Sequence, residues 1–417
     1  MEAETPSPEY PGPDPLTAEL GTAWLEELGT LSDESPQLTR TFLSPALTLA
    51  KDRIAEWMRA ASLEVFEDEA GNLIGRRDCG DPLAGTLVCG SHLDTVRNAG
   101  KFDGALGVVA GILAAAEIHR RGHPLPHHLE VVGFSDEEGV RFQTAFLGSQ
   151  YYTGQLNEFG LTRIDADGVT VRKAMADHTP AFPPPPRRGK FIGYLEAHIE
   201  QGPVLENAGL ALGVVTSIAG QTRVRLTLGG CSGHAGTTPM SLRHDALTGA
   251  AECVLLIEER ARAAPSGLVA TVGELQIAFP ASNVIPGQVE FTLDIREANA
   301  EVLEKFCRDL FAELEIRMKR RDLTLQIAIA FTSPPVPCDL ILSAALEKIV
   351  LDHQSQCLHL ASGAGHDAVA LAAVAPMAML FVRCRKGLSH HPDEFVEPED
   401  ITLAIRILTE FLATYRA

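Results

Sequence analysis

Apolar and polar positions follow two different patterns along this chain, and each pattern predicts one layer of the fold. Residues 86–92 ("TLVCGSH") and 128–135 ("HLEVVGFS") are short apolar runs typical of buried strands, with a Gly- and Ala-rich helical segment between them. Strand, helix and strand in this order predict a βαβ unit and therefore a parallel sheet. Two amphipathic helices, at 16–31 and 44–61, and two further strands, at 193–202 and 375–384, are predicted to join this layer.

The middle of the chain has a different pattern. Residues 222–228 alternate apolar and polar side chains, as a half-exposed strand does. After this strand the pattern predicts a helix at 241–264, strands at 268–279 and 288–296, a helix at 298–320 and a strand at 323–331. The order βαββαβ is ferredoxin-like. We therefore expect an α/β catalytic domain with a mainly parallel sheet (residues 1–213 and 332–417), interrupted by an inserted ferredoxin-like domain (214–331).

Composition fits this interpretation and excludes some partners. The chain has 417 residues, is 45% hydrophobic and 22% charged, and carries a net charge of -20. That length favours more than one domain. A strongly acidic chain has no basic field to attract phosphates, which argues against nucleic acid or an anionic membrane as a partner. A small anionic substrate stays possible, because one arginine can dominate a site locally.

The sequence predicts no targeting signal and no membrane anchor. The start, "MEAETPSPEYPGPDP", is acidic and proline-rich, unlike a signal peptide, and a disordered start is expected. No apolar run approaches the length of a membrane span. Eight scattered cysteines contain no CxxC pair, which indicates reduced thiols and a cytoplasmic protein.

Five groups of metal-liganding type follow predicted strands or begin a helix. They are His92, Asp103, the pair Glu137 and Glu138, His198, and the histidines of "LSHHPDEF". Sites in open α/β sheets form at the carboxyl ends of the strands, where elements distant in sequence converge. Three imidazoles with carboxylates suit Zn²⁺ or Mn²⁺ better than Ca²⁺ or Mg²⁺. A shared carboxylate would hold two such ions close together.

Each of these groups alone has a simpler explanation. A single histidine on a strand is more often a hydrogen-bonded core residue, and Asp103 alone is a helix N-cap. The acidic triplet Asp136–Glu138 alone is a solvated turn. Their coincidence at one predicted edge favours the metal site. Asp94, two residues after His92, would lie on the same face of an extended strand and orient that imidazole.

A set of motifs then identifies a family. The chain contains "GSHLDTVRNAGKFDGALG", "SDEEGVRFQTAFLGS", "LEAHIEQGPVLE", "SGHAGTTPM", "ASNVIPG", "LDIR", "SGAGHDA" and "GLSHHPDEF". In this order they resemble the dimetal amidase branch of the aminoacylase/carboxypeptidase superfamily. That branch includes allantoate amidohydrolase, N-carbamoyl-L-amino-acid hydrolase and β-ureidopropionase. The resemblance runs from about residue 16 to the C-terminus.

The resemblance implies a role for each matching residue. His92 and His198 would bind separate divalent ions, Zn²⁺ or Mn²⁺, with Asp103 bridging them. Glu138 would complete one ion's ligands and His390 the other's, with His391 in a variable position of the motif. Glu137 would be the general base, which receives a proton from water and returns it to the leaving nitrogen. Asp136 keeps its interpretation as part of a turn.

The inserted domain would add groups for the substrate. His234 resembles the family's oxyanion-stabilising imidazole, often supplied across a dimer interface. Asn283 and Arg296 resemble a clamp for the substrate carboxylate, for which a guanidinium offers a bidentate fork. Without the motif, His234 could equally be an incidental residue of a glycine-rich turn, and Arg296 a surface arginine. Gln201 and Ala364, Gly365 and His366, at a predicted helix start, would also line the pocket.

The expected function follows from the family. We expect a dimetal amidohydrolase that cleaves a ureido C–N bond of a small acid, with conversion of allantoate to ureidoglycine, ammonia and CO₂ as the leading reaction. N-carbamoyl-L-amino-acid hydrolase and β-ureidopropionase are the alternatives. A dipeptidase-like enzyme and a metal-free binding homologue rank lower. The resemblance also implies a homodimer formed through the inserted domain, which would act as a lid.

Overall fold

A computed structural model describes residues 14–186, 189–265 and 267–416. Most of the acidic, proline-rich start, for which disorder was expected, lies outside these residues. By their contacts the residues form two units, each described by itself. Unit 1 comprises Met1–Thr216, Cys338–Leu360 and Gly365–Ala417, and unit 2 comprises Ser217–Pro337 and Ala361–Ala364. The contacts thus place the crossings a few residues after the expected positions, 214 and 331, and add the short segment 361–364 to unit 2.

Unit 1 is built on a mixed nine-stranded sheet in the order β1-β2-β4-β3-β5-β16-β6-β14, with β15 paired to β6. The central strands β4, β3, β5 and β16 are parallel, and the outer pairs whose register is known are antiparallel. The strands are β1 (Glu64–Glu67), β2 (Leu73–Arg77), β3 (Thr86–His92), β4 (His128–Phe134), β5 (Phe191–Ile199), β6 (Leu212–Ile218), β14 (Val336–Pro337), β15 (Leu358–Ser362) and β16 (Met377–Val382).

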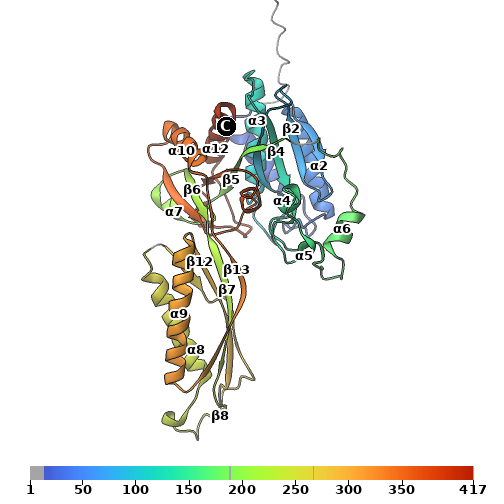
Figure 1. The fold of residues 1–417 in the computed structure, drawn as a ribbon. Coiled ribbons are helices and arrows are strands. Elements are labelled where there is room, and N and C mark those ends of the chain that lie inside the picture. Colours follow the sequence, from blue (N-terminus) through green and yellow to red (C-terminus); the bar gives the residue numbers. More distant parts are fainter. Residues whose placement is uncertain (1–13, 187–188, 266, 417) are drawn as a thin grey trace, which may run out of the picture. The chain divides into compact units, whose positions relative to one another are not determined.

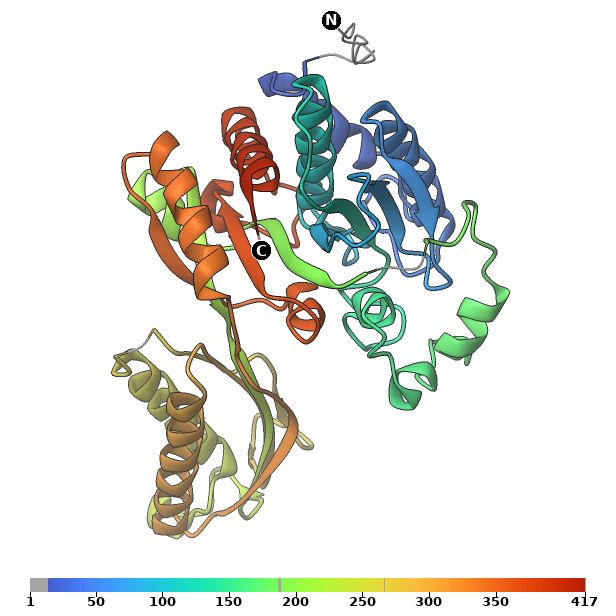
Figure 2. The ribbon, with the colours of Figure 1, turned by 45° about the horizontal axis from the view of Figure 1, so that its top comes forward.

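Helices α3, α10 and α12 pack over one face of this sheet (Figure 2), and α1 packs against α3 and α12. The α3 helix is buried almost throughout, because its Gly and Ala positions allow close packing on the strands. The helices of unit 1 are α1 (Ala18–Leu28), α2 (Pro45–Ala60), α3 (Ala105–Arg120), α4 (Leu147–Tyr152), α5 (Glu158–Leu161), α6 (Val171–Asp177), α7 (Val204–Ala208), α10 (Leu340–His353), α11 (Ala368–Leu371) and α12 (Pro398–Thr414).

Unit 2 is a five-stranded antiparallel sheet with two helices packed on one of its faces (Figure 1). Its main strands follow the order β10-β12-β7-β13, with β9 also paired to β12. A small two-stranded sheet, β8 with β11, is separate from it. The elements are β7 (Gly220–Gly229), β8 (Gly233–His234), α8 (Ala246–Arg262), β9 (Val269–Thr271), β10 (Leu275–Ile277), β11 (Val284–Ile285), β12 (Gln288–Glu297), α9 (Ala300–Arg320) and β13 (Thr324–Ser333).

Two predicted elements of unit 2 differ from the structure. The strand expected over 268–279 is two short strands, β9 and β10, that lie against different parts of β12. The helix expected from 241 begins at Ala246, because the Asp245 side chain accepts hydrogen bonds from the amides of Leu247 and Thr248 and caps the helix there. In the part of the chain that the structure describes, no helix is long and apolar enough to cross a membrane.

Candidate dimetal active site

The candidate site of unit 1 lies where its central parallel strands end. His92 is the last residue of β3, and β4 ends at Phe134, just before the acidic triplet. His198 is next to last in β5. Since β3, β4 and β5 are parallel neighbours, these side chains gather at the carboxyl edge of the sheet.

Asp103 lies at the centre of this group. Its Oδ1 is 3.0 Å from Nε2 of His198 and 3.7 Å from Nε2 of His92. Its Oδ2 is 3.1 Å from Nε2 of His390, which in turn is 3.4 Å from Oε1 of Glu138. One carboxylate therefore faces two sets of ligand atoms, one with each oxygen.

The candidate ligand groups overlap: His92 also forms a group with Glu137 and Glu138, and His198 another with Glu196 and His366. His92 and His198, expected on separate ions, share one oxygen of Asp103 and form one cluster with it. Asp103, Glu138 and His390 form another cluster, and in each the ligand atoms lie within 4.8 Å of one another. The reason is geometric: β3 and β5 are adjacent strands, whereas Glu138 and His390 approach from loops.

The donor set fits two divalent ions. Asp103 is only 5% exposed, and its Oδ1 is buried without a hydrogen bond, so this oxygen is available to a cation. Nδ1 of His92 contacts the carbonyl of Asp94 at 3.0 Å, and Nδ1 of His198 contacts the carbonyl of Ile199 at 2.9 Å. Because a carbonyl only accepts, Nδ1 is the protonated nitrogen in both rings and Nε2 is left to bind an ion. Imidazole with carboxylate suits Zn²⁺ or Mn²⁺.

Asp94 holds the main chain of the acidic pair. Its Oδ1 accepts a hydrogen bond from the amide of Glu137 at 2.9 Å, and its Oδ2 accepts one from the amide of Glu138 at 3.1 Å. Burial, together with the charge of Glu138, raises the pKa of Glu137 well above its usual value, although His92 opposes the shift. A carboxyl group with a raised pKa is suited to taking up a proton and releasing it again.

Asp136 is not part of a solvated turn. It is 1% exposed, and neither of its carboxylate oxygens has a hydrogen bond. Burial and the nearby Asp94 and Asp367 raise its pKa well above the usual value. The prediction that Asp136 belongs to a solvated turn was wrong, because the chain after β4 stays in the protein interior. A run of three acidic residues does not indicate this in the sequence.

Two contacts of Asp103 were not predicted. The Ser389 hydroxyl donates to its Oδ2 at 3.0 Å, and Oε1 of Glu394 accepts hydrogen bonds from the amides of Phe102 and Asp103. Burial and the charge of Asp103 raise the pKa of Glu394 to about 7. Both residues belong to "LSHHPDEF", so their place beside His390 in the motif was the available signal.

The predicted pocket residues of unit 1 also approach the cluster. Nε2 of Gln201 donates to Oδ2 of Asp103 at 3.1 Å. The ring of His366 packs edge-on to that of His198, with 4.4 Å between centroids, and burial lowers the pKa of His366 well below its usual value. A Cβ added to Gly365 would lie 3.8 Å from Oε1 of Glu137. His391, in contrast, is exposed and accepts a hydrogen bond from the Asp393 amide.

Unit 2 separates the substrate groups predicted within it. His234 on β8 pairs with Val284 on β11, and the amide of Ala235 donates to the carbonyl of Asn283, so His234 and Asn283 are neighbours. Arg296 lies at the other end of β12, roughly 26 Å from Gln288 at about 3.3 Å per residue. Asn283 and Arg296 of one chain therefore do not form the expected clamp together.

Arg296 is already held within unit 2. Its Nε and Nη2 donate to the Asp294 carboxylate at 3.2 and 3.1 Å, and its Nη1 donates to the Gly363 carbonyl at 2.5 Å. The segment after Gly363 continues through Ala364, also assigned to unit 2, to Gly365 and His366. All three guanidinium nitrogens thus donate hydrogen bonds within unit 2, which fixes the orientation of the Arg296 side chain.

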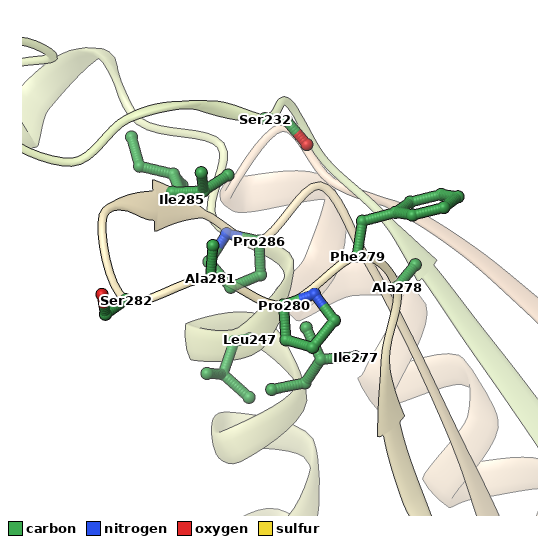
Figure 3. A pocket seen from close by; sticks show the side chains of 11 residues that line it. Ser232, Leu247, Ile277, Ala278, Phe279, Pro280, Ala281, Ser282, Ile285 and Pro286 are labelled. Carbon is green, nitrogen blue, oxygen red and sulfur yellow. The ribbon is translucent and has the colours of Figure 1, made fainter.

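A cavity of about 410 Å³ lies in unit 2, with Ser282 among the residues that line it (Figure 3). Apolar side chains, among them Leu247, Ile277 and Pro286, and two serines line it, and none of its lining residues is ionisable. It therefore offers no group for hydrolytic chemistry. The clusters around Asp103, in contrast, hold groups that can bind a metal ion.

Several known proteins align with most of this chain and with most of their own length. Allantoate deiminase 1 of Glycine max is 41% identical over 94% of this chain and 88% of that protein. An N-carbamoyl-L-amino acid amidohydrolase of Geobacillus stearothermophilus is 40% identical over 92% of this chain and 95% of that protein. The structure of an amidase of the hydantoinase/carbamoylase family from Burkholderia multivorans superimposes with a TM-score of 0.89 at 32% identity, covering 95% of this chain and 97% of that one. The model of peptidase family M20/M25/M40 matches residues 88–414, and the chain belongs to this family.

Proposed function

We propose that this protein is a dimetal amidohydrolase that cleaves a ureido C–N bond of a small carboxylic acid, with allantoate as its substrate. The observation that carries the proposal is the pair of ligand clusters that share Asp103. Enzymes of this family are dimetal hydrolases. When bound, two Zn²⁺ or Mn²⁺ ions would polarise the scissile carbonyl and acidify a water molecule.

The chain's own residues would then perform the following tasks. His92, His198 and Asp103 would bind one ion, and Asp103, Glu138 and His390 the other. Glu137, buried and fixed through its amide by Asp94, would take a proton from water and deliver it to the leaving nitrogen. Neutral His366 and the amide of Gln201 would contact the ureido group. Arg296 would bind the substrate carboxylate with the N–H groups that neither Asp294 nor the Gly363 carbonyl occupies.

The substrate cannot be chosen by identity alone, because the relatives named for allantoate and for N-carbamoyl-L-amino acids are 41% and 40% identical to this chain. A panel therefore tests the proposal: allantoate, N-carbamoyl-β-alanine, N-carbamoyl-L-amino acids and dipeptides, each with enzyme reconstituted with Mn²⁺ or Zn²⁺. We expect ammonia release to be fastest from allantoate. Activity confined to N-carbamoyl amino acids would replace the substrate and keep the chemistry. No activity on any ureido acid would reject the proposal.

We further propose a homodimer through unit 2, the ferredoxin-like insertion, which would also act as a lid. β13 is an edge strand of its sheet, and Ile329 and Phe331 on it are 63% and 48% exposed. An edge of ten residues with exposed apolar side chains is suited to pairing with a second copy. Phe279 is 94% exposed and stands out from the loop near Asn283 (Figure 3), which fits a contact with a partner.

An active site shared between two protomers would explain why His234 and Arg296 lie far apart within unit 2. One substrate cannot touch His234 and Arg296 of the same unit when roughly the length of β12 lies between them. In a symmetric dimer, His234 and Asn283 of one protomer could serve the site of the other.

Co-expression of two inactive chains, Glu137→Gln and His234→Ala, tests this arrangement. With shared sites, the mixed dimer has one intact site, and activity should return to roughly a quarter of wild type. Each variant expressed alone is the control. No recovery, in mixed dimers confirmed by two affinity tags, would place His234 in its own protomer's site.

The eight free cysteines fit a reducing compartment, and we propose a cytoplasmic enzyme.

A further inference from the structure

Asp103 lies in a segment that has no regular structure to hold it. Residues 93–104 connect β3 to α3 without helix or strand, and the helix begins only at Ala105. A carboxylate that faces two sets of ligands must nevertheless be placed to within a fraction of an ångström. The first turn of α3 holds the carbonyl of Phe102, which accepts the Leu106 amide at 2.9 Å, so it is the amides of Phe102 and Asp103 that another part of the chain must hold.

The Glu394 side chain makes that connection. Its Oε1 accepts hydrogen bonds from two successive amides, Phe102 at 2.8 Å and Asp103 at 3.0 Å. Glu394 is 3% exposed, so water does not compete for these bonds. A carboxylate that accepts two amides in the interior forms strong, directional hydrogen bonds.

The packing around this carboxylate is close. A Cβ added to Gly100 would lie 2.3 Å from the carboxyl carbon of Glu394 and 2.4 Å from its Oε1. Glycine at this position therefore leaves the space that the carboxylate fills. The neighbouring rings of Phe102 and Phe395 meet edge to face, with 5.8 Å between centroids, and add to the contact between the two segments.

Glu394 also belongs to the segment that carries His390. Its amide donates to the carbonyl of His391 at 3.0 Å, which closes the turn after His390. Nε2 of His390 is 3.1 Å from Oδ2 of Asp103. One side chain thus connects two segments, 291 residues apart at the Asp103 contact, that each present a ligand to the same cluster.

We propose that Glu394 is a positioning residue that sets the spacing between Asp103 and His390 and thereby the affinity of the cluster for a divalent ion. This inference rests on the proposed function, because it requires that the cluster bind metal. The competing explanation is a purely structural one, in which the buried carboxylate only stabilises the fold. The two explanations predict different metal affinities for variants that lose the same amount of stability.

The test compares Glu394→Met, which fills similar space without an acceptor, with Glu394→Gln, whose amide oxygen can still accept. Binding of Mn²⁺ and Co²⁺ to the full-length metal-free protein is measured by calorimetry, and the Co²⁺ site by its visible absorption spectrum. We expect Glu394→Met to weaken binding of one ion by roughly 10- to 100-fold and to alter the spectrum. Glu394→Gln should stay within about threefold of wild type.

Two further variants separate position from stability. Asp400→Asn weakens another buried carboxylate, which binds Arg383 at 2.8 and 3.0 Å, and should lower the melting temperature while metal affinity stays unchanged. Gly100→Ala pushes the Glu394 carboxylate away without removing it and should reproduce the loss of affinity. Gly100→Ala also keeps the inference testable if Glu394→Met fails to fold.

The outcomes distinguish the inference from the function on which it rests. If wild type binds fewer than two ions at saturation, the dimetal centre and the role of Glu394 are both rejected. If wild type binds two ions, and Glu394→Met or Gly100→Ala binds them with the same affinity and spectrum, only the role of Glu394 is rejected. An equal loss of affinity in Asp400→Asn would show that metal binding simply follows stability, and would also reject it.

Discussion

Replacement of Asp94 by asparagine tests whether this residue holds the two acids of the site. The Asp94 carboxylate accepts the amides of Glu137 and Glu138, one on each oxygen, at 2.9 and 3.1 Å. An asparagine oxygen can accept one of them, but its NH₂ group would then face the other N–H. The contact between His92 and the Asp94 carbonyl involves the main chain and would remain. The substitution also removes the charge of Asp94 Oδ1, which lies 3.5 Å from Nδ1 of His92, so it weakens the support of this imidazole as well as that of the acidic pair.

The size of the effect follows from the hydrogen bond that is lost. Removal of a bond to a buried charged group costs about 1.5–3 kcal/mol, and each 1.4 kcal/mol is a factor of ten. We expect kcat/KM for allantoate to fall roughly 10- to 100-fold, with weaker binding of the ion that Glu138 contacts. Both are measured on enzyme reconstituted with Mn²⁺, by ammonia release and by calorimetry.

A control for the loss of a carboxylate is Asp165→Asn. Oδ1 of Asp165 accepts the amides of Asp167 and Val169 at 3.0 and 2.9 Å in the loop between α5 and α6, and its Oδ2 accepts a hydrogen bond from Nε of Arg141 at 3.0 Å, so the substitution removes a charge that holds a loop without a catalytic group. It should change kcat/KM by less than about twofold. If Asp94→Asn has the kcat/KM and metal affinity of the wild type, the reasoning is refuted. Glu137 and Glu138 would then keep their positions without the Asp94 carboxylate.

Three further predictions address single residues. Glu137→Gln should bind two ions yet lose at least about 100-fold in turnover, and full turnover with both ions bound would reject the base. Gly365→Val should lower kcat/KM roughly tenfold with normal metal content, because even the first added carbon would lie 2.6 Å from the Phe146 ring; unchanged kinetics would contradict this. Burial lowers the pKa of His127 from 6.5 to about 4, so the folded state disfavours its charged form and stability falls as pH drops from about 6.5 towards 4. His127→Phe should lose roughly 2 kcal/mol less stability than wild type between pH 7 and 5 in urea unfolding, and equal losses would exclude His127 as the cause.

Hydrophobic periodicity predicted the elements that position the site. The runs at 86–92 and 128–135 became β3 and β4, because strands covered on both faces need continuous apolar side chains. Pattern alone missed β1 and β2, which are short and contain Glu and Arg, and it merged β9 with β10. Such strands are stabilised by their neighbours in the sheet more than by their own sequence.

The candidate ligands were predictable because their motifs are local, whereas their grouping was not. His92 and His198 are 106 residues apart, and only the pairing of β3 with β5 brings them to one oxygen of Asp103. The same limit applies to Glu394, whose two hydrogen bonds depend on a contact across 291 residues. Residue type and spacing identify which groups can bind a metal, but the tertiary fold decides which of them share an ion.

The acids of the site have to be considered as one system of charges. Burial, reinforced by neighbouring carboxylates, raises the pKa of Asp136 and Asp367 well above their usual values, and burial also raises that of Glu196. So many carboxylates in one buried region are unfavourable for the chain alone, since each disfavours the charge of the next. Divalent cations reverse this relation and favour the ionised forms. Asp136, which looks like part of a turn in the sequence, would therefore add to the negative potential of this region once cations are bound, although it is in neither ligand cluster.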